Sequence, residues 1–242
     1  MDTSSRLLST IKEASAKYGI RYVIKKAVYV WISLNYYKIF KNKKIFTFRG
    51  KKYHYTYHIY NTTWENERAI EISLAVDLIK KYESKQILEV GNVVSNYFNM
   101  PHDVVDKYEK GLGVINEDIV DFHSNKKYDL IISISTLEHV GWDETPRDDK
   151  KIPKAIENLK KLLNPDSGML FITVPIGYNT VLDKLVKDGT IRFHEQYYLH
   201  RVSKNEWIEA SWSDVQDAKF GSPFQGANGL IVGIIHGKIP NE

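Results

Sequence analysis

The sequence predicts an α/β fold in which helices cover both faces of a doubly wound, mostly parallel sheet of about seven strands. Three observations carry this prediction. From residue 86 onward, short runs rich in Ile and Val alternate with segments of helical period. The runs are continuously apolar, which is typical of strands that are buried on both faces. The length of 242 residues and the 43% hydrophobic content suffice for one such domain with an extension.

The N-terminal part, residues 1–62, is expected to form an extension, and residues 63–242 the main domain. Helical period predicts helices over 5–17 and 20–41, and alternation around Arg49-Gly50 predicts a hairpin of 45–48 with 52–58. The apolar segment within 20–41 is too short to span a bilayer. Two interpretations of that helix stay open: it packs on the domain, or it lies, basic and aromatic, on an anionic membrane surface.

In the main domain, Thr63 is the expected N-cap of a helix that runs from Trp64 to Lys81. The remaining elements follow from apolar runs and helical spacing, and the final strand is expected to be antiparallel. Strands are predicted at 86–90, 103–106, 113–116, 129–135, 169–174, 215–220 and 229–236, and helices at 150–163 and 203–211.

Composition excludes several classes of protein. The net charge is only +4 and no basic stripe with interleaved aromatic residues lies in the second half, so a nucleic-acid partner is not expected. Zero cysteines exclude disulfides and thiolate chemistry. The polar N-terminus has no signal-peptide pattern, so we expect a cytoplasmic protein, with the helix at 20–41 as the candidate for peripheral membrane contact.

Acidic residues follow the predicted parallel strands, at the edge where ligands of such sheets bind. Glu89 ends the first strand, Asp106 the second, and Asp118 follows the third. A dinucleotide needs a glycine-rich turn for its pyrophosphate, but the first strand is followed by Gly91 alone. Carboxylates suit S-adenosylmethionine instead, because it carries an ammonium, a sulfonium and ribose hydroxyls but no phosphate.

The segments ILEVG, VVDKYE, INEDIVDF, YDLIISISTLEHV and GMLFITVPIGYN resemble, in this order, the class I S-adenosylmethionine-dependent methyltransferases, in particular their small-molecule branch. The resemblance covers roughly residues 64–236 and implies a Rossmann-like fold. It implies that Asp106 binds the ribose hydroxyls and that Asp118 frames the adenine. The expected cofactor-binding residues are Glu89, Gly91, Asn92, Asp106, Lys107, Asp118, Ile119, Ser135 and Glu138.

A hydroxyl acceptor needs a base, and His139, just after the fourth strand, is the leading candidate, with His194 as the second. The alternative for His139 is a role in capping or packing a helix. The acceptor is expected to contact polar and aromatic residues of the neighbouring loops: Trp142, Tyr178, Asn179 and Arg192. No metal site is expected, because Ser135 stands where quinone-related relatives carry a carboxylate ligand, and Glu138 with His139 gives too few ligands.

The sequence thus predicts methyl transfer from S-adenosylmethionine to a small polar acceptor, most readily the hydroxyl of a saccharide or another hydroxylated metabolite. Two alternatives belong to other classes: a catalytically silent nucleotide-binding scaffold and an NAD(P)-dependent oxidoreductase. Glu89 and Asp106 are 17 positions apart, fewer than the roughly 20 usual for such a pair. The segment 92–97 is therefore expected to form a shortened helix or an irregular loop.

Overall fold

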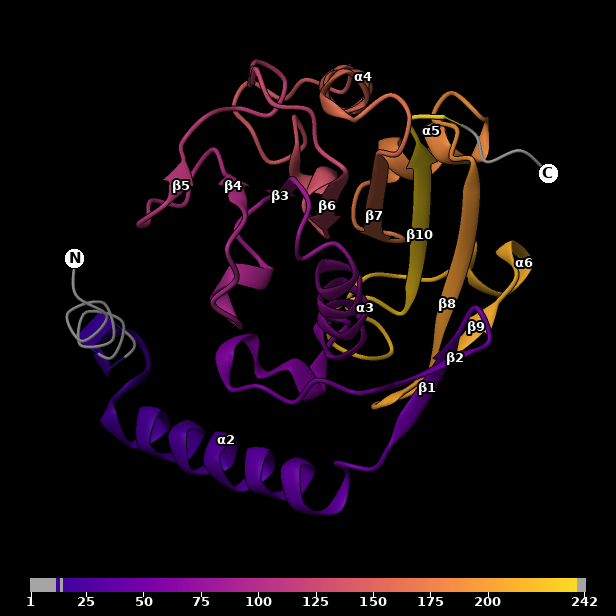
Figure 1. The fold of residues 1–242 in the computed structure, drawn as a ribbon. Coiled ribbons are helices and arrows are strands. Elements are labelled where there is room, and N and C mark those ends of the chain that lie inside the picture. Colours follow the sequence, from indigo (N-terminus) through magenta and orange to yellow (C-terminus); the bar gives the residue numbers. More distant parts are fainter. Residues whose placement is uncertain (1–11, 14, 239–242) are drawn as a thin grey trace.

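A computed structural model describes residues 12, 13 and 15–238 of the chain. Its centre is an eight-stranded sheet in the order β5-β4-β3-β6-β7-β10-β8-β9 (Figure 1). The first five strands in this order are parallel to one another, and β10 is antiparallel to both of its neighbours. The strands are β3 (Ile87–Val90), β4 (Asp103–Val105), β5 (Val114–Ile115), β6 (Leu130–Ile134), β7 (Met169–Pro175), β8 (Glu195–Ser203), β9 (Glu206–Ala210) and β10 (Gly229–His236).

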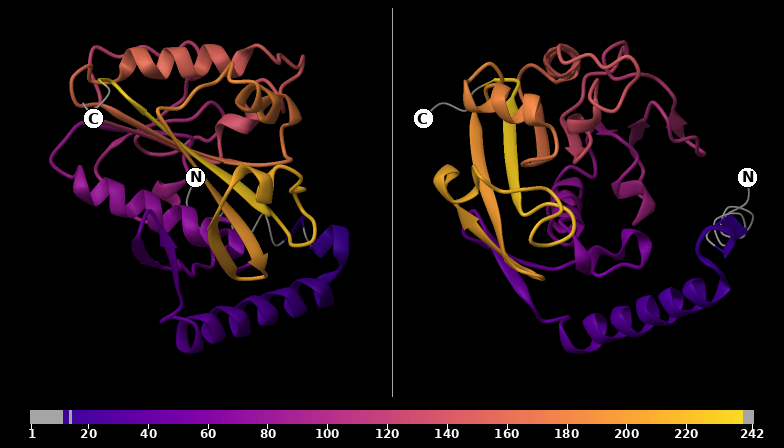
Figure 2. Two further views of the ribbon diagram at one scale, coloured as in Figure 1. Left: turned by 90° about the vertical axis from the view of Figure 1, so that its right-hand side faces the viewer. Right: turned by 180° about the vertical axis from the view of Figure 1, so that it is seen from behind.

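Helices cover the sheet on both faces, which confirms the doubly wound fold and the antiparallel last strand (Figures 1 and 2). One apolar cluster packs α4 (Lys151–Leu162) and α5 (Thr180–Lys187) on one face. The other cluster packs α3 (Arg68–Lys81) on the opposite face. Strands β3, β6 and β7 are buried along their whole length, as their continuous apolar runs predict.

The predicted hairpin is present as β1 (Ile45–Phe48) and β2 (Lys51–His54), and Arg49 and Gly50 both have positive φ in its turn. Its side chains Phe46 and Phe48 are buried in the same core as α3. Tyr55, which follows the hairpin, accepts a hydrogen bond at its hydroxyl from the Trp207 N–H of β9 (3.0 Å). The hairpin therefore packs with the sheet, and the domain boundary at residue 62 stays a prediction.

The helix α2 (Ile20–Phe40) confirms the element predicted at 20–41, but none of its residues is buried. It lies along the outside of the molecule and contacts the body through the short helical segment η1 (Tyr60–Glu65) (Figure 1). One side of the helix packs on the body, where the Tyr37 ring stacks on Trp64, so both interpretations of this helix stay open. The helix predicted at 5–17 lies mostly outside the described residues; residues 12, 13 and 15–18 are helical.

Three local predictions are wrong. The helix α3 begins at Arg68, and Thr63 does not cap it, because its hydroxyl donates to Thr56 O (2.6 Å) and accepts from His58 N–H. The segment 203–211 is mainly β9, where alternation buries Trp207 and leaves Ile208 half exposed. The strand predicted at 215–220 is absent, because Val215 ends the short helix α6 (Trp212–Val215) and β8 takes that place in the sheet.

Candidate functional site

A pocket of about 270 Å³ opens at the carboxyl ends of β3 to β6, where the strand order reverses. Among the described residues that line it, five carry carboxylates and one, Lys107, carries a cation, so the pocket is acidic. It brings together most of the residues expected to bind a cofactor. These are Gly91, Asn92, Asp106, Lys107, Asp118, Ile119 and Ser135, and the predicted base His139 joins them.

Glu89 is buried and its carboxylate is held inside the loop that follows β3. The Val93 N–H (2.7 Å) and the Val94 N–H donate to Oε1. The Ser95 hydroxyl donates to Oε2 at 2.7 Å, and Nε2 of His102 lies 2.7 Å from the same oxygen. The carboxylate thus fixes the short helical turn η2 (Val94–Asn96). This turn confirms the shortened helix or irregular loop expected at 92–97. Glu89 itself does not line the pocket, although the sequence predicts that it binds the cofactor.

Gly91 lies in the left-handed region at φ 82°, where glycine is strongly favoured over other residues. A Cβ atom at this position would come within 2.3 Å of the Thr136 side chain, which follows β6. The glycine is therefore required both by the backbone conformation and by the close packing of two strand ends. Gly91 and Thr136 both line the pocket, beside Val90 and Val105.

Asp106 faces the pocket and also organises its rim. Its Oδ1 accepts hydrogen bonds from the N–H groups of Tyr108 (2.8 Å) and Glu109 (2.7 Å), and its Oδ2 accepts one from the Asn92 N–H (2.9 Å). The Asn92 side chain in turn donates to Glu109 (2.8 Å). A carboxylate oxygen can accept two hydrogen bonds, so Oδ2 has room for a further donor such as a ribose hydroxyl.

Asp118 and Glu144 share two lysines at the far side of the pocket. Lys107 Nζ lies 2.9 Å from each carboxylate, and Lys151 Nζ lies 2.5 Å from each. Burial raises the pKa of Asp118 and Glu144, but the hydrogen bonds from the two lysines outweigh it and lower both pKa values. The cluster is therefore ionised, and Asp118 can contact a cofactor only beside these ammonium groups.

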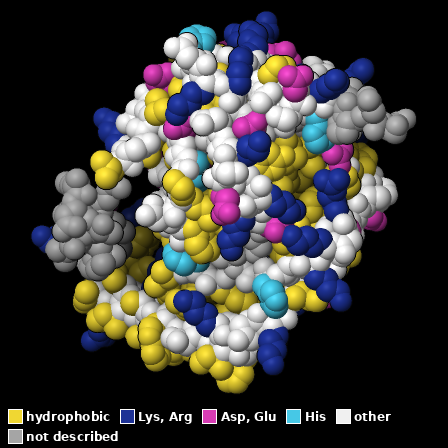
Figure 3. Space-filling view, viewed as in Figure 1, with side chains coloured by type: hydrophobic (Ala, Val, Ile, Leu, Met, Phe, Trp, Pro, Cys, Tyr) yellow, Lys and Arg dark blue, Asp and Glu magenta, His cyan; other side chains and the backbone are white. Residues whose placement is uncertain are grey.

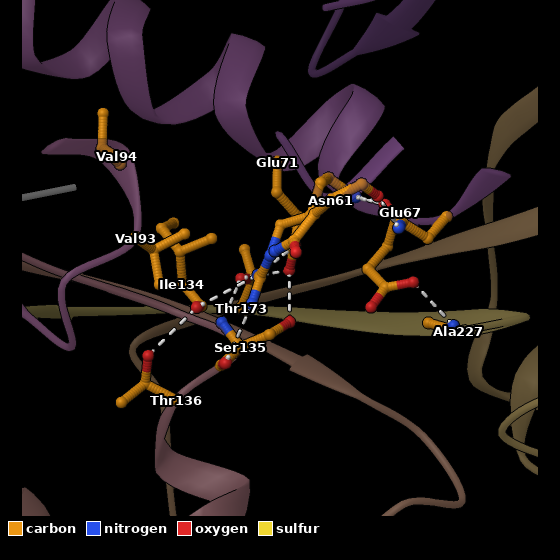
Figure 4. A network of polar contacts seen from close by, with 12 residues as sticks. Asn61, Glu67, Glu71, Val93, Val94, Ile134, Ser135, Thr136, Thr173 and Ala227 are labelled. Atoms are coloured by element: carbon orange, nitrogen blue, oxygen red, sulfur yellow. Dashed lines mark hydrogen bonds and ion pairs between the residues drawn. The ribbon is translucent and has the colours of Figure 1, made fainter. Parts of the chain in front are cut away.

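Ser135 anchors the end of β6 to a buried polar network (Figure 4). Its hydroxyl and that of Thr173 donate to the same oxygen of Glu71, at 2.5 and 2.6 Å. Arg68 forms an ion pair with the other oxygen (2.6 Å) and donates to the carbonyl groups of Ile134 and Ser135. Ser135 has a positive φ of 37°, and the network holds this strained turn in place.

His139 lies on the pocket rim, in the segment η3 (Leu137–His139), and forms a dyad with Asp143. Nδ1 of His139 is 2.5 Å from Oδ2 of Asp143, and the hydroxyl of Tyr178 donates to the same oxygen (2.7 Å). Burial alone would raise the pKa of Asp143. The hydrogen bonds from His139 and Tyr178 outweigh it, so the pKa of Asp143 is lowered. An ionised Asp143 keeps the proton of His139 on Nδ1, which leaves Nε2 free to accept one.

An aromatic row continues from the dyad. The rings of His139 and Tyr178 are 4.8 Å apart, and those of Tyr178 and Phe220 are 4.9 Å apart, both in edge-to-face geometry. The side chain of His139 is 45% exposed and Phe220 is 39% exposed. The row therefore runs from the pocket rim as a partly apolar, partly exposed surface.

Glu138 is buried behind the dyad and does not line the pocket. Its Oε1 lies 3.7 Å from Nε2 of His139, and its Oε2 has no hydrogen-bond partner within the described part of the chain. Burial raises the pKa of the Glu138 carboxyl well above its ordinary value. Glu138 thus lies beside His139 without reaching hydrogen-bonding distance of Nε2, and the structure does not place it in the pocket where the sequence predicts a cofactor contact.

His194 does not belong to this site. The chain runs back through α5 after β7. His194, just before β8, therefore lies near the start of β7, at the amino ends of the parallel strands, where its N–H donates to Ile234 O and its Nδ1 accepts from the His236 N–H. The length of β7, roughly 20 Å, separates this end from the pocket. Arg192, which donates to Gly189 O, lies on the same segment after α5. The structure therefore does not bring His194 or Arg192 to the pocket, and its geometry does not support their predicted roles as second base and acceptor-binding residue.

Two further acceptor candidates have structural partners. Asn179 is buried and caps α5, accepting from the N–H groups of Val181 and Leu182 and donating to Glu138 O. Its amide is thus not available to an acceptor in this structure. The ring of Trp142 is covered by the guanidinium of Arg147, with Cζ 3.4 Å from the ring centre, and does not line the pocket.

The sequence does not predict the roles of the residues that act through others. Asp143 lies four residues after His139, and this spacing is the signal that could have identified it as the partner of the base. Arg68 and Glu71 lie in α3, far from the strand ends in sequence, and Lys151 opens α4. The sequence gives no comparable signal for these three residues, because their roles depend on how the helices are placed over the sheet.

No family model and no curated protein matches the sequence. Solved structures match at low identity. The N-methyltransferase NodS of Bradyrhizobium japonicum with S-adenosyl-L-homocysteine is 15% identical, with 66% of this chain and 84% of that chain covered and a TM-score of 0.42. A sugar N-methyltransferase of Streptoalloteichus is 12% identical, with coverages of 69% and 87% and a TM-score of 0.36.

An S-adenosylmethionine-dependent methyltransferase of Clostridium acetobutylicum is 9% identical over 87% of this chain and 100% of that chain, with a TM-score of 0.39. At this level of similarity the fold assignment rests on the strand order. That order gives a doubly wound, mostly parallel sheet with an antiparallel last strand, the fold that the sequence predicts.

Proposed function

We propose that this protein transfers a methyl group from S-adenosylmethionine to a small polar acceptor, with a hydroxyl of a saccharide or a similar metabolite as the preferred target. One observation carries the proposal. The pocket at the strand-order reversal is lined by five carboxylates and one lysine, and that lysine is paired with two of the carboxylates. Such a pocket favours a cationic nucleoside without phosphates.

The donor set fits this cofactor. Gly91 lines the pocket with backbone alone, Oδ2 of Asp106 has room for a ribose hydroxyl, and the Ile119 and Val140 side chains offer an apolar surface for a base. When bound, S-adenosylmethionine supplies the electrophilic methyl group. The protein then has to hold the acceptor in line and to remove its proton.

His139 is suited to that second task. Nε2 is the proton acceptor, because Asp143 holds the proton of the ring on Nδ1, and an imidazole base works near neutral pH. Tyr178 fixes Asp143 through its hydroxyl. A neutral alcohol needs such a base far more than an amine does, which supports O-methylation.

The aromatic row of His139, Tyr178 and Phe220 supports a saccharide-like acceptor. Sugar rings present apolar C–H faces beside hydroxyl groups, and a ring surface next to a carboxylate matches both. The half-exposed Phe220 ring and the Asp143 carboxylate both contact Tyr178.

The oxidoreductase alternative is disfavoured by the loop after β3. A pyrophosphate needs free N–H groups in that loop, and those of Val93 and Val94 are already bonded to Glu89. The silent-scaffold alternative predicts no binding of S-adenosylmethionine.

Calorimetric titration of the full chain with S-adenosylmethionine, S-adenosylhomocysteine and NAD tests the cofactor. Micromolar binding of the first two and none of NAD supports the proposal, whereas binding of NAD alone or of no ligand contradicts it. Mass spectrometry of polar metabolites and glycans incubated with enzyme and cofactor then tests the acceptor. A product heavier by one CH₂ group identifies it, and fragmentation that places the methyl group on nitrogen contradicts O-methylation.

A further inference from the structure

The helix α2 (Ile20–Phe40) is apolar although it is not buried. Aliphatic or aromatic residues make up 15 of its 21 positions, yet the helix has no buried residue. Trp31 is 67% exposed and Ile39 is 63% exposed. Keeping so much apolar surface in water is unfavourable, so a contact that covers α2 is expected.

The exposed aliphatic residues of α2 share one face. Ile20, Ile24, Val28 and Ile32 recur every four residues, Ile39 follows seven residues later, and each is more than half exposed. We call these five residues, together with Trp31, the outer face of α2. By helical spacing, this face points away from the side that touches the protein.

The inner side of α2 is fixed to the body by specific contacts. The Tyr29 hydroxyl donates to Glu65 (2.7 Å), and the Tyr37 ring stacks on Trp64 at 5.9 Å. The Asn205 side chain also donates to the Tyr37 hydroxyl. Because these contacts hold α2 from one side, its outer face is displayed rather than free to fold back on the body.

The charge around α2 is of one sign. The 51 residues between Glu13 and Glu65 contain eleven Lys or Arg and no Asp or Glu. In the space-filling view, apolar and basic side chains gather along the lower rim, over the position of α2 in Figure 1 (Figure 3). The rest of the chain is correspondingly acidic, since the total net charge is +4.

Within the described residues, no helix is long and apolar enough to cross a bilayer. A second copy of the chain is a poor occupant of the outer face, because two copies would bring Arg21, Lys25 and Lys38 against one another. A surface with acidic headgroups over an apolar layer matches both properties of α2. Aromatic rings and lysine stems are favoured at such an interface.

We propose that the outer face of α2 lies on a bilayer that contains acidic phospholipids, parallel to its surface, and that the basic residues of 17–44 bind the lipid headgroups. This surface is connected to the pocket through η1. Glu65 contacts α2, and Arg68, three residues later, donates to the Ser135 carbonyl at the pocket rim (3.3 Å). The segment that holds α2 is thus also the segment that leads to the pocket rim.

Vesicle flotation with the full chain tests this proposal. Vesicles of phosphatidylcholine with about one third phosphatidylglycerol are compared with vesicles of phosphatidylcholine alone. The protein is expected to float with the acidic vesicles and to stay in solution with the neutral ones. Replacement of Lys25 and Lys26 by Gln should weaken binding about fivefold for each lysine removed. Replacement of Trp31 and Ile32 by Ser should weaken it at least tenfold.

Two matched variants serve as controls. Leu112→Ser removes a fully exposed apolar residue from the loop between β4 and β5 and should leave flotation unchanged. Trp31→Phe keeps the apolar face and should keep flotation, while the blue shift of tryptophan emission on adding vesicles should be largely lost. The proposal is overturned if the wild type does not float with acidic vesicles, or if the Trp31/Ile32 variant floats equally well. It is also overturned if that variant converts a dimer to a monomer without lipid, because a second copy then covers α2.

Discussion

Nδ1 of His139 lies 2.5 Å from Oδ2 of Asp143, and the Tyr178 hydroxyl donates to the same carboxylate oxygen. The base is thus oriented by a carboxylate that a second residue fixes, which is the arrangement general bases require. His139→Ala should lower the turnover number about a hundredfold or more and spare cofactor binding. Transfer of labelled methyl groups into a polar metabolite extract, beside calorimetry, measures both effects.

Asp143→Asn is the companion variant, because Asn keeps the shape but not the charge that holds the proton on Nδ1. A smaller loss of turnover is expected. His123→Ala, at an exposed loop histidine, is the matched control and should retain full turnover. Full turnover in His139→Ala would show that another group accepts the proton.

Asp106 and Asp103 lie at opposite ends of the same strand, which gives a matched pair for cofactor binding. Asp106→Asn should raise the Kd for S-adenosylmethionine at least tenfold, because hydrogen bonds to a charged group are each worth about 1.5–3 kcal/mol. Asp103 pairs with Lys126 at the far edge (2.6 Å), and Asp103→Asn should leave that Kd unchanged. Equal Kd values for the two variants would place the cofactor elsewhere.

Glu89→Gln should destabilise the fold. Its carboxylate accepts from two backbone N–H groups and the Ser95 hydroxyl, and a Gln side chain offers only one acceptor oxygen. Loss of a charged acceptor from a buried site costs about 1–3 kcal/mol, so the free energy of unfolding in urea should fall by that amount. An unchanged unfolding midpoint would mean that water or a rearranged loop replaces these bonds.

Asp183 should make the stability of the protein depend on pH. Burial raises its pKa from the ordinary 3.8 to about 6, against a hydrogen bond from the Gly177 N–H. The folded state therefore binds this proton more tightly than the unfolded state. The stabilising contribution of protonated Asp183 is fully present below pH 4 and is lost as the pH rises through about 6.

Asp183→Asn removes this loss and can still accept from Gly177. Above pH 6 it should be more stable than the wild type by about 1–3 kcal/mol, and below pH 4 the difference should vanish. Asp188→Asn is the contrast, because hydrogen bonds at Thr190 lower the pKa of Asp188, so its stabilising contribution is present at neutral pH. Urea unfolding at several pH values measures both variants. A stability difference between Asp183→Asn and the wild type that does not grow between pH 4 and pH 6 contradicts the prediction.

The parallel half of the sheet could be predicted from sequence because burial on both faces leaves an unbroken apolar run, as in β6 and β7. Strand β8 could not be predicted in this way, because its residues are polar or aromatic and most of them are only partly buried. The local pattern of its partner β9 predicts a helix, and the segment is a strand because it pairs with β8 at the edge of the sheet. Helix α3 starts later than predicted, because the Thr63 hydroxyl donates to the Thr56 carbonyl and does not cap the helix.

For the site, the sequence predicts which strand ends carry acids but not where each carboxylate points. Glu89 and Asp106 both end parallel strands, yet the first turns into its own loop and the second faces the pocket. His194 follows the pocket strand in sequence, but the intervening helix α5 carries the chain back across the sheet. Local sequence patterns do not show at which end of the sheet a segment lies, because this depends on how the chain runs between the strands.

The hairpin also has a consequence for the solubility of the sheet. β9 is an edge strand, and an uncovered edge pairs readily with other chains. The hairpin shields it, since Tyr55 bonds the Trp207 N–H and Arg49 pairs with Glu195 of β8 at 2.7 Å. A protein shortened to residues 63–242 would lose this cover and expose an aggregation-prone edge. Any truncation that removes α2 for membrane studies should therefore retain the chain from Ile45 onward.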